Sequence, residues 1–512
     1  MVHTEIVNFK SVCVRNNINM IHSSWTAHNN FALGVTPVGR VIFGVESAKV
    51  EEVTASPVPT ESGARSHRPT HCVVGGAHAF ILRISSFFGL APLRFESRSN
   101  GFTVSISGAM CVYSYILVTV LVICTIFGLV AEINVGVQLS VRMSSRMSQV
   151  VSTCDVLVVV ATAGAGVYGA PRRMRNMLKF MENIASVDTS IGGQYSLLTE
   201  RKLCGIILGI LIFFSILIAD DFTFYALQAK KLDREWDVVT NYLGFYMLWF
   251  VVLILELQFA FTALSVRARF SAVNDALALT ARQVSIPVEK PKSASPLNIY
   301  AIRVAPVGNQ RSANVSLLVD SMTGREHVVI IKRTVSLISA SGEPRLIVSP
   351  CDAVRRLAAL HGTLCDVVNS IDDSYGLPLI VILISTLLHL IVTPYFLIME
   401  IIVSTNRVHF LVLQFLWCVT HMLRMIVVVE PGHYTIAEGK RTEGLVCRLM
   451  TSAPSTGVLP SRLEIFSRQL MLQSVSYAPM GMCTLHRPLI ASVIGAVTTY
   501  LVILIQFQRY DN

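Results

Sequence analysis

The sequence has few charged residues for its length. Only 14% of its 512 residues are Asp, Glu, Lys or Arg, whereas soluble domains average about 25%. Hydrophobic residues make up 53%, and they occur in long separate runs. This composition excludes a disordered tail, a coiled coil and a collagen-like fibre, and it indicates a protein of the lipid bilayer.

Signatures of catalysis and metal binding are also missing. We find no Walker loop, HExxH motif, nucleophile elbow, kinase motif set or zinc-type Cys/His spacing. The first 75 residues lack the short apolar core and cleavage site of a secretory signal peptide, so we expect an internal helix to direct membrane insertion. We expect no enzymatic activity, no metal and no cofactor.

Seven apolar runs are long enough to cross a membrane as helices. The third is interrupted by Asp220 and Asp221, which makes its end the least defined boundary. The sequence therefore predicts an all-α, polytopic membrane protein. The runs cover residues 109–131, 147–170, 204–219 (extending to about 226), 242–266, 376–403, 408–429 and 488–507.

The distribution of basic residues predicts the orientation. Of the 42 Lys and Arg, 34 fall in segments on one side of the seven spans, seven fall on the other side, and Arg424 lies within a span. The positive-inside rule then places the N-terminus in the cytoplasm and the C-terminus outside the cell. The net charge of +10 is explained in this way, and we expect no nucleic-acid partner.

A literal G-x-G-x-x-G sequence occurs at Gly164, Gly166 and Gly169. A dinucleotide-binding loop would need a strand before it and a helix after it. This one lies inside the second apolar run, so we interpret it as small residues that let helices approach closely.

We single out five ionisable residues within the predicted spans, where burial in lipid is costly. They form either a polar ligand cavity or ion path, or a buried network whose members satisfy one another. For Arg424 we expect a side chain that reaches the membrane interface, and for Asp155 both interpretations stay open. The five are Asp155, Glu256, His389, His421 and Arg424.

The sixth span carries a polar and aromatic face. Gln414, Trp417 and His421 are spaced i, i+3 and i+7 and so share one side of a helix. An aromatic ring beside amide and imidazole groups could hold a sugar-like or alkaloid-like ligand, although packing between helices explains the same pattern.

The last span has a polar face in an otherwise apolar helix. Thr499, Ile503 and Gln506 lie on one side, with Phe507 beside them. Such a helix suits a pore lining, and a hydrogen bond between helices is the alternative.

This span carries a family motif. Thr499-Tyr500, five apolar residues and Gln506-Phe507 resemble the TYhhhhhQF signature of insect gustatory receptors, at the place where that family has it. Several other segments are similar to the family, and with the motif they cover most of residues 78–508. They are Phe88-Gly89-Leu90-Ala91-Pro92, then His361, Leu364, Cys365, Asp366, Asn369 and Tyr375-Gly376, and then Glu438 and Thr442.

The resemblance implies a ligand-gated, non-selective cation channel that detects a tastant such as a sugar or a bitter compound. It implies a homotetramer, or a heteromer with related subunits, surrounded by lipid in the plasma membrane of chemosensory neurons. The last helix, 488–507, would line the pore, with Thr499, Tyr500, Ile503, Gln506 and Phe507 as pore or gate residues. Candidate ligand contacts, chosen by depth and polarity, are Asp155, Gln414 and Trp417.

Three features depart from the family. Residues 1–77 have no family resemblance, and we expect a disordered cytoplasmic segment. Residues 284–345 form a long cytoplasmic insertion within the seven-helix domain 78–508. Leu501 stands where the major sweet-receptor group has glutamate, which leaves the fructose-type receptors and the broad group that is often bitter-sensing.

Two other classes compete with this interpretation. A G-protein-coupled receptor would have the reverse orientation, which the basic residues oppose. A secondary transporter would usually show repeated halves and broken helices. Pro378 and Pro394 in the fifth span are the only hint of such breaks.

Overall fold

The chain divides into two units, residues 1–67 and 68–512, and every described residue lies in the second. The computed structural model describes residues 72–74, 76–98, 101–135, 140, 146–191, 194–285, 337–338, 344–345, 349–403, 408–453 and 457–511.

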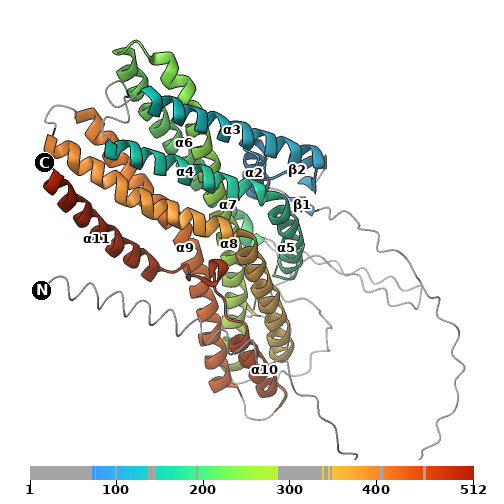
Figure 1. Ribbon diagram of the computed structural model, residues 1–512. Helices are drawn as coiled ribbons and strands as arrows, with labels where there is room; N and C mark the ends of the chain where they lie inside the picture. Colours follow the sequence, from blue (N-terminus) through green and yellow to red (C-terminus); the bar gives the residue numbers. More distant parts are fainter. Residues whose placement is uncertain are drawn as a thin grey trace, which may run out of the picture. The chain divides into compact units, whose positions relative to one another are not determined.

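The seven predicted spans are confirmed as seven helices long and apolar enough to cross a membrane (Figure 1). The third, α6, continues without a break through Asp220 and Asp221, and Tyr246 on the next helix donates a hydrogen bond to the buried Asp221 at 2.5 Å. The seven helices are α3 (Gly108–Val135), α4 (Arg146–Tyr168), α6 (Gln194–Lys230), α7 (Glu235–Ser285), α8 (Pro350–Val403), α9 (Val408–Ser452) and α11 (Arg487–Asp511).

Three of these helices extend far beyond the predicted spans. α7, α8 and α9 contain 51, 54 and 45 residues, whereas about 20 are enough to cross the hydrocarbon core. Pro378 and Pro394 both lie inside α8 without ending it. The two prolines therefore give no support to the broken helices of a transporter.

Shorter elements complete the described chain. The basic connection after the second span is a helix, α5 (Ala170–Ile191). A further helix, α10 (Leu459–Leu472), and a 3-10 turn, η1 (Pro479–Gly481), connect α9 to α11. Two short strands, β4 (Leu337–Ile338) and β5 (Pro344–Arg345), pair antiparallel.

The all-α class is confirmed, with a small sheet that the sequence did not predict. Strands β1 (Cys72–Val74), β2 (Leu93–Arg98) and β3 (Gly101–Ile106) form an antiparallel sheet in the order β1-β3-β2. Helix α2 (Gly76–Phe87) lies between β1 and β2 in the chain and packs against α6 and α7. The predicted N-terminal segment 1–77 and insertion 284–345 lie mostly outside the described residues.

Helix α7 is the centre of the bundle, and α11 is at its margin. In the most apolar window of α7, 83% of the residues are buried, whereas none is buried in that of α11. α3 approaches α7 closely at Gly128, where an added Cβ would stand 2.1 Å from the carbonyl oxygen of Asn241. The glycine is therefore required by the contact between these helices.

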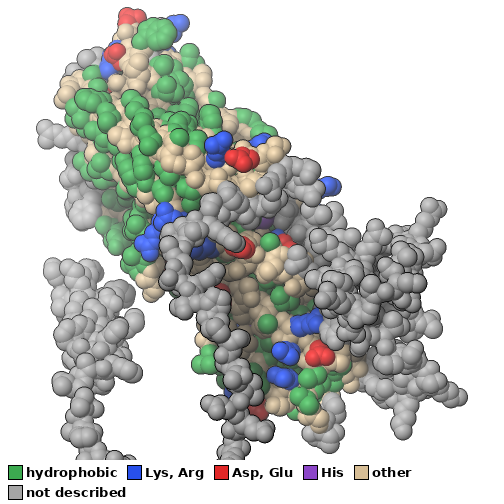
Figure 2. All heavy atoms as spheres, turned by 90° about the vertical axis from the view of Figure 1, so that its right-hand side faces the viewer, with side chains coloured by type: hydrophobic (Ala, Val, Ile, Leu, Met, Phe, Trp, Pro, Cys, Tyr) green, Lys and Arg blue, Asp and Glu red, His purple; other side chains and the backbone are tan. Residues whose placement is uncertain are grey.

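The two ends of the bundle differ. One, which we call the short-loop end, carries the α6–α7 and α8–α9 connections and the end of α11; the sheet end carries β1–β3 and α10 (Figure 1). At the short-loop end Glu132 of α3 accepts a hydrogen bond from Ser140 at 2.6 Å and pairs with Arg234 at 3.8 Å. Figure 2 shows hydrophobic side chains in a band, with charged side chains above and below it.

Candidate functional site

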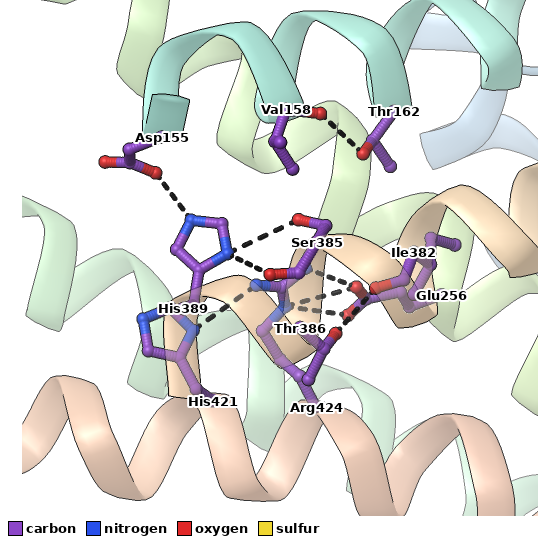
Figure 3. Close-up of polar contacts among 10 residues, drawn as sticks. All are labelled: Asp155, Val158, Thr162, Glu256, Ile382, Ser385, Thr386, His389, His421 and Arg424. Carbon is purple, nitrogen blue, oxygen red and sulfur yellow. Dashed lines mark hydrogen bonds and ion pairs between the residues drawn. The ribbon is translucent and has the colours of Figure 1, made fainter. Parts of the chain in front are cut away.

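The five ionisable residues singled out above meet in one cluster, built by α4, α7, α8 and α9 (Figure 3). Asp155 is nine residues from the start of α4 at Arg146, and His421 is thirteen from the start of α9 at Val408. At about 1.5 Å per residue they lie about 14 and 20 Å from the short-loop end. The cluster is thus close to the middle of a hydrocarbon core about 30 Å thick.

Glu256 and Arg424 form a buried ion pair at one side of the cluster. The side chains are 0% and 2% exposed. Arg424 Nε donates to both carboxylate oxygens of Glu256 at 3.1 Å, and Nη2 donates to Oε1 at 2.5 Å. The expectation that Arg424 reaches the membrane interface is wrong, because a carboxylate of equal depth on α7 binds its guanidinium in the interior.

Asp155 and His389 form the second pair, with Oδ1 and Nε2 2.5 Å apart. His389 Nδ1 lies 2.5 Å from the backbone oxygen of Ser385. A carbonyl oxygen only accepts, so Nδ1 carries a hydrogen. The contact of Nε2 with Asp155 is a hydrogen bond between the imidazole and the carboxyl group, and it joins α8 to α4.

Aromatic rings join the two pairs. The rings of His389 and His421 stack with centroids 4.7 Å apart, and Trp417 stacks on His421 at 5.6 Å. Trp249 lies 4.9 Å from the His389 ring and 5.6 Å from that of Trp417. The Arg424 guanidinium carbon lies 4.6 Å from the Trp249 ring centroid, a distance typical of a cation–π contact.

A small cavity adjoins this cluster between α3, α4 and α7. It has a volume of about 10 Å³, enough for about one water molecule. Ser152 and Val156, which flank Asp155 along α4, contribute to its wall together with Phe245, whose ring lies 6.3 Å from that of Trp249.

The predicted ligand residues reach this region to different degrees. Asp155 and Trp417 are members of the cluster, while Gln414 lies half-buried on α9, one turn nearer the short-loop end. Sequence reasoning missed Trp249 and Ser385. Trp249 is a bulky residue in a span with no polar periodicity around it, so no signal distinguished it from packing.

The glycine motif also has a packing role. Gly166 lies in α4, and a Cβ there would stand 2.8 Å from the Leu255 side chain and 3.2 Å from that of Leu90. Its carbonyl oxygen accepts a hydrogen bond from the buried Arg173 at 2.8 Å, and the Leu90 carbonyl accepts a second from the same guanidinium at 3.0 Å. This is a helix contact rather than a nucleotide loop.

Helix α11 carries the predicted pore residues. One side packs on a buried patch of α8 and α9, formed by Leu390, Met425 and Val429, through Leu489, Ile490, Val493 and Val497. Thr499, Tyr500, Ile503 and Gln506 are all exposed. The side chain of Phe507 lies outside the described part of the chain.

By the period of a helix, Thr499, Ile503 and Gln506 lie on a different side from the packed residues. The Thr499 hydroxyl donates to the Gly495 backbone oxygen at 3.0 Å. An exposed polar face thus runs along the last span within one subunit.

Seven spanning helices, a buried polar cluster and an unburied last helix define a multi-pass membrane protein of the receptor or channel type. The model of the 7tm chemosensory receptor family matches residues 78–510, and the chain belongs to this family.

Individual relatives agree with this assignment. The gustatory receptor for sugar taste 43a of Drosophila melanogaster is 29% identical over 443 residues, covering 84% of this chain and 98% of the relative. The putative gustatory receptor 28a of the same species is 28% identical over 171 residues, covering 31% of this chain and 36% of the relative.

The fold is also similar to solved structures. The insect olfactory receptor OR5 from Machilis hrabei has a TM-score of 0.54 at 12% identity, covering 84% of this chain and 97% of that one. Its complex with eugenol has a TM-score of 0.55 at 10% identity, with the same coverage.

Proposed function

We propose that this chemosensory receptor is a taste receptor and a ligand-gated, non-selective cation channel. Four subunits surround a central pore, either as a homotetramer or with related subunits, in the plasma membrane of chemosensory neurons. The N-terminus is cytoplasmic, so the short-loop end faces outward and the sheet end faces the cytoplasm.

The unburied last helix carries this proposal. α11 exposes Thr499 and Gln506 although it crosses the membrane, and an amide facing lipid is costly. Closed cyclic symmetry brings the same face of each subunit to one axis, where such side chains meet water. Thr499, Tyr500, Ile503, Gln506 and Phe507 then line or gate the pore.

We propose that a sugar binds at the buried cluster, with Asp155, Gln414 and Trp417 among its contacts, in a second arrangement of the helices that widens the cavity of about 10 Å³ beside it. Carboxylate, imidazole and amide groups bind hydroxyls, while the ring of Trp417 packs on apolar C–H groups. The similarity to a receptor named for sugar taste supports this class over a bitter compound.

The packing offers a route from ligand to pore. Leu390 and Met425 pack against α11. In the sequence, Leu390 directly follows His389 and Met425 directly follows Arg424, and both His389 and Arg424 belong to the cluster. A ligand that binds one arrangement of α8 and α9 more tightly shifts the population of that arrangement. The surface under α11 shifts with it, because the same helical turns carry both sets of residues.

The first experiment records currents from outside-out patches of cells that express this chain alone, across a panel of sugars and bitter compounds. Excision removes soluble signalling components. A sugar-evoked cation current supports the proposal. Silence that persists when related subunits are co-expressed, with surface expression confirmed, favours a G-protein-coupled receptor or a transporter.

The pore assignment is tested by cysteine substitution. We expect Thr499→Cys and Ile503→Cys channels to be blocked by a charged, water-soluble thiol reagent. Val497→Cys is the matched control, because Val497 packs on the α8–α9 patch. Equal modification of all three, relative to the unsubstituted channel, would exclude the assigned pore face.

The ligand assignment is tested by Asp155→Asn. Loss of a charge-assisted hydrogen bond should raise the half-maximal ligand concentration by about tenfold or more. Thr153→Val on the same helix is the control, since the Thr153 hydroxyl donates to the Gln149 backbone oxygen of that helix at 2.7 Å. An unchanged dose response for Asp155→Asn would make Asp155 structural.

The orientation is tested with epitope tags. An antibody should reach a tag at the C-terminus of the chain on intact cells, and a tag at the N-terminus only after permeabilisation. The reverse pattern would contradict the assigned topology.

A further inference from the structure

A second depression lies at the sheet end, beside the start of the first span. α2, β2 and the first two turns of α3 enclose a groove of about 330 Å³. Because α3 enters the membrane here, the groove stands at the membrane surface. It is lined by Arg83, Ser86, Phe87, Phe95, Met110 and Tyr113.

Arg83 gives the groove a fixed positive charge. Its guanidinium carbon lies 4.0 Å from the centroid of the Phe102 ring and 5.7 Å from that of Phe95. These stacking contacts hold the side chain in place. Among the described residues, no carboxylate forms an ion pair with Arg83, so its N–H donors are available to an anion.

The rest of the groove is apolar and opens toward the lipid. Phe87 is 68% exposed, and Tyr113 is held across it by a 2.8 Å hydrogen bond from its hydroxyl to the Phe87 carbonyl oxygen. Ile116 and Val120, which follow Tyr113 at i+3 and i+7, are also exposed. A hydrocarbon chain that leaves the groove would continue along this face of α3.

The surrounding charges favour an anion. Glu96, on β2, is already paired with Arg94 at 3.6 Å. Arg175 of α5 interacts electrostatically with Cys111, in the first turn of α3. Arg175 belongs to an exposed basic face of α5 that also includes Arg172 and Lys179.

We propose that this groove binds one anionic phospholipid, with the phosphate on Arg83 and an acyl chain along Phe87, Met110 and Tyr113. An amphiphile at the membrane surface matches both a positive group and an apolar channel that continues onto a spanning helix. With the orientation proposed above, the groove faces the cytoplasmic leaflet, which is the leaflet that carries anionic lipid. The site does not depend on the channel function or on the sugar.

The test uses the full-length receptor in nanodiscs of phosphatidylcholine that contain a trace of phosphatidic acid with a photoreactive acyl chain. Both leaflets carry the probe, so the result does not depend on orientation. Peptides that acquire the lipid are identified by mass spectrometry. We expect labelling of the α2 and early α3 peptides, and we expect excess unlabelled phosphatidylserine, but not phosphatidylcholine, to compete.

Variants assign the effect to Arg83. Arg83→Gln should reduce this labelling about fivefold, the effect of one basic group near an anionic membrane surface. Arg83→Lys should restore part of it, since the charge is kept. Arg94→Gln is the matched control on the adjacent strand and should change labelling less than twofold, because Arg94 does not line the groove and has Glu96 beside it at 3.6 Å.

Three results would overturn the proposal. If unlabelled phosphatidylcholine competes with the probe as strongly as phosphatidylserine does, the groove is a non-selective lipid contact. Equal losses in Arg83→Gln and Arg94→Gln show general surface electrostatics. No label in α2 or α3 shows that protein, such as residues preceding the sheet or a second copy of the chain, covers the groove. Elution of each variant at the position of the native receptor in size-exclusion chromatography shows that it is folded.

Discussion

Removal of Arg424 from its ion pair should be among the most damaging single changes in the transmembrane bundle. Arg424→Met keeps much of the side-chain volume and leaves the Glu256 carboxylate buried without its three hydrogen bonds. Breaking a buried pair from one side costs about 3–5 kcal/mol. For domains of 150–250 residues, each kcal/mol lowers the melting temperature by about 2–4 °C, so this loss corresponds to about 6–20 °C. The chain is longer than such a domain, so we take this range as an upper bound on the fall in melting temperature.

The assay is thermal unfolding of detergent-solubilised receptor, followed by the loss of the native peak in size-exclusion chromatography. Arg424→Met, Glu256→Gln and the double variant form a mutant cycle. We expect the double variant to be more stable than the sum of the single losses predicts, because no unpaired charge is left. Glu464→Gln is the control: its 2.6 Å pair with Arg468 is 56% and 74% exposed, and such pairs contribute at most about 1 kcal/mol.

A melting temperature for Arg424→Met as high as that of Glu464→Gln would refute this reasoning. So would strictly additive losses in the cycle. Either result would mean that Glu256 and Arg424 do not neutralise one another in the membrane interior.

Two further predictions concern packing and thiol chemistry. Gly128→Val should reduce the melting temperature and surface expression, because its Cβ would meet the Asn241 carbonyl at 2.1 Å, an overpacking that costs about 1–3 kcal/mol or more. Gly205→Val is the control, because nothing lies within 4 Å of the Cβ position there. Equal losses of stability in the two variants would contradict the close contact at Gly128. Burial raises the pKa of the Cys483 thiol, and the charge of Asp372 raises it further. Alkylation of Cys483 at pH 7.4 should therefore be slower than that of a cysteine in a short peptide, and it should accelerate as the pH rises. An alkylation rate equal to that of the peptide would show that the thiol is not buried.

The sequence predicted the membrane spans because each is a long apolar run, and the length of such a run is a local property. It also identified every ionisable member of the cluster, since a charge within an apolar run is conspicuous. It could not predict the pairing. Glu256 and Arg424 are 168 positions apart in the chain, and only the packing of α7 against α9 decides that they meet.

The remaining misses have a similar origin. The small sheet depends on antiparallel pairing of β1, β2 and β3. β2 and β3 are six residues long and alternate apolar and polar residues, which is the pattern of a half-buried strand, but a search for long apolar runs does not detect this signal. The basic connection after the second span is helical because one side of α5 packs its buried Met174, Met177 and Leu178 against the bundle. Propensity alone did not distinguish this helix from a loop.

The length of α7 has a mechanical consequence. Glu256 is 29 residues before the end of the helix at Ser285, a distance of about 44 Å along the axis. A tilt of about 5° around the polar cluster would move that far end by about 4 Å, because an unbroken helix acts as a stiff rod. A change of only a few degrees in helix direction at the cluster can thus become a displacement of several ångströms at the opposite side of the membrane.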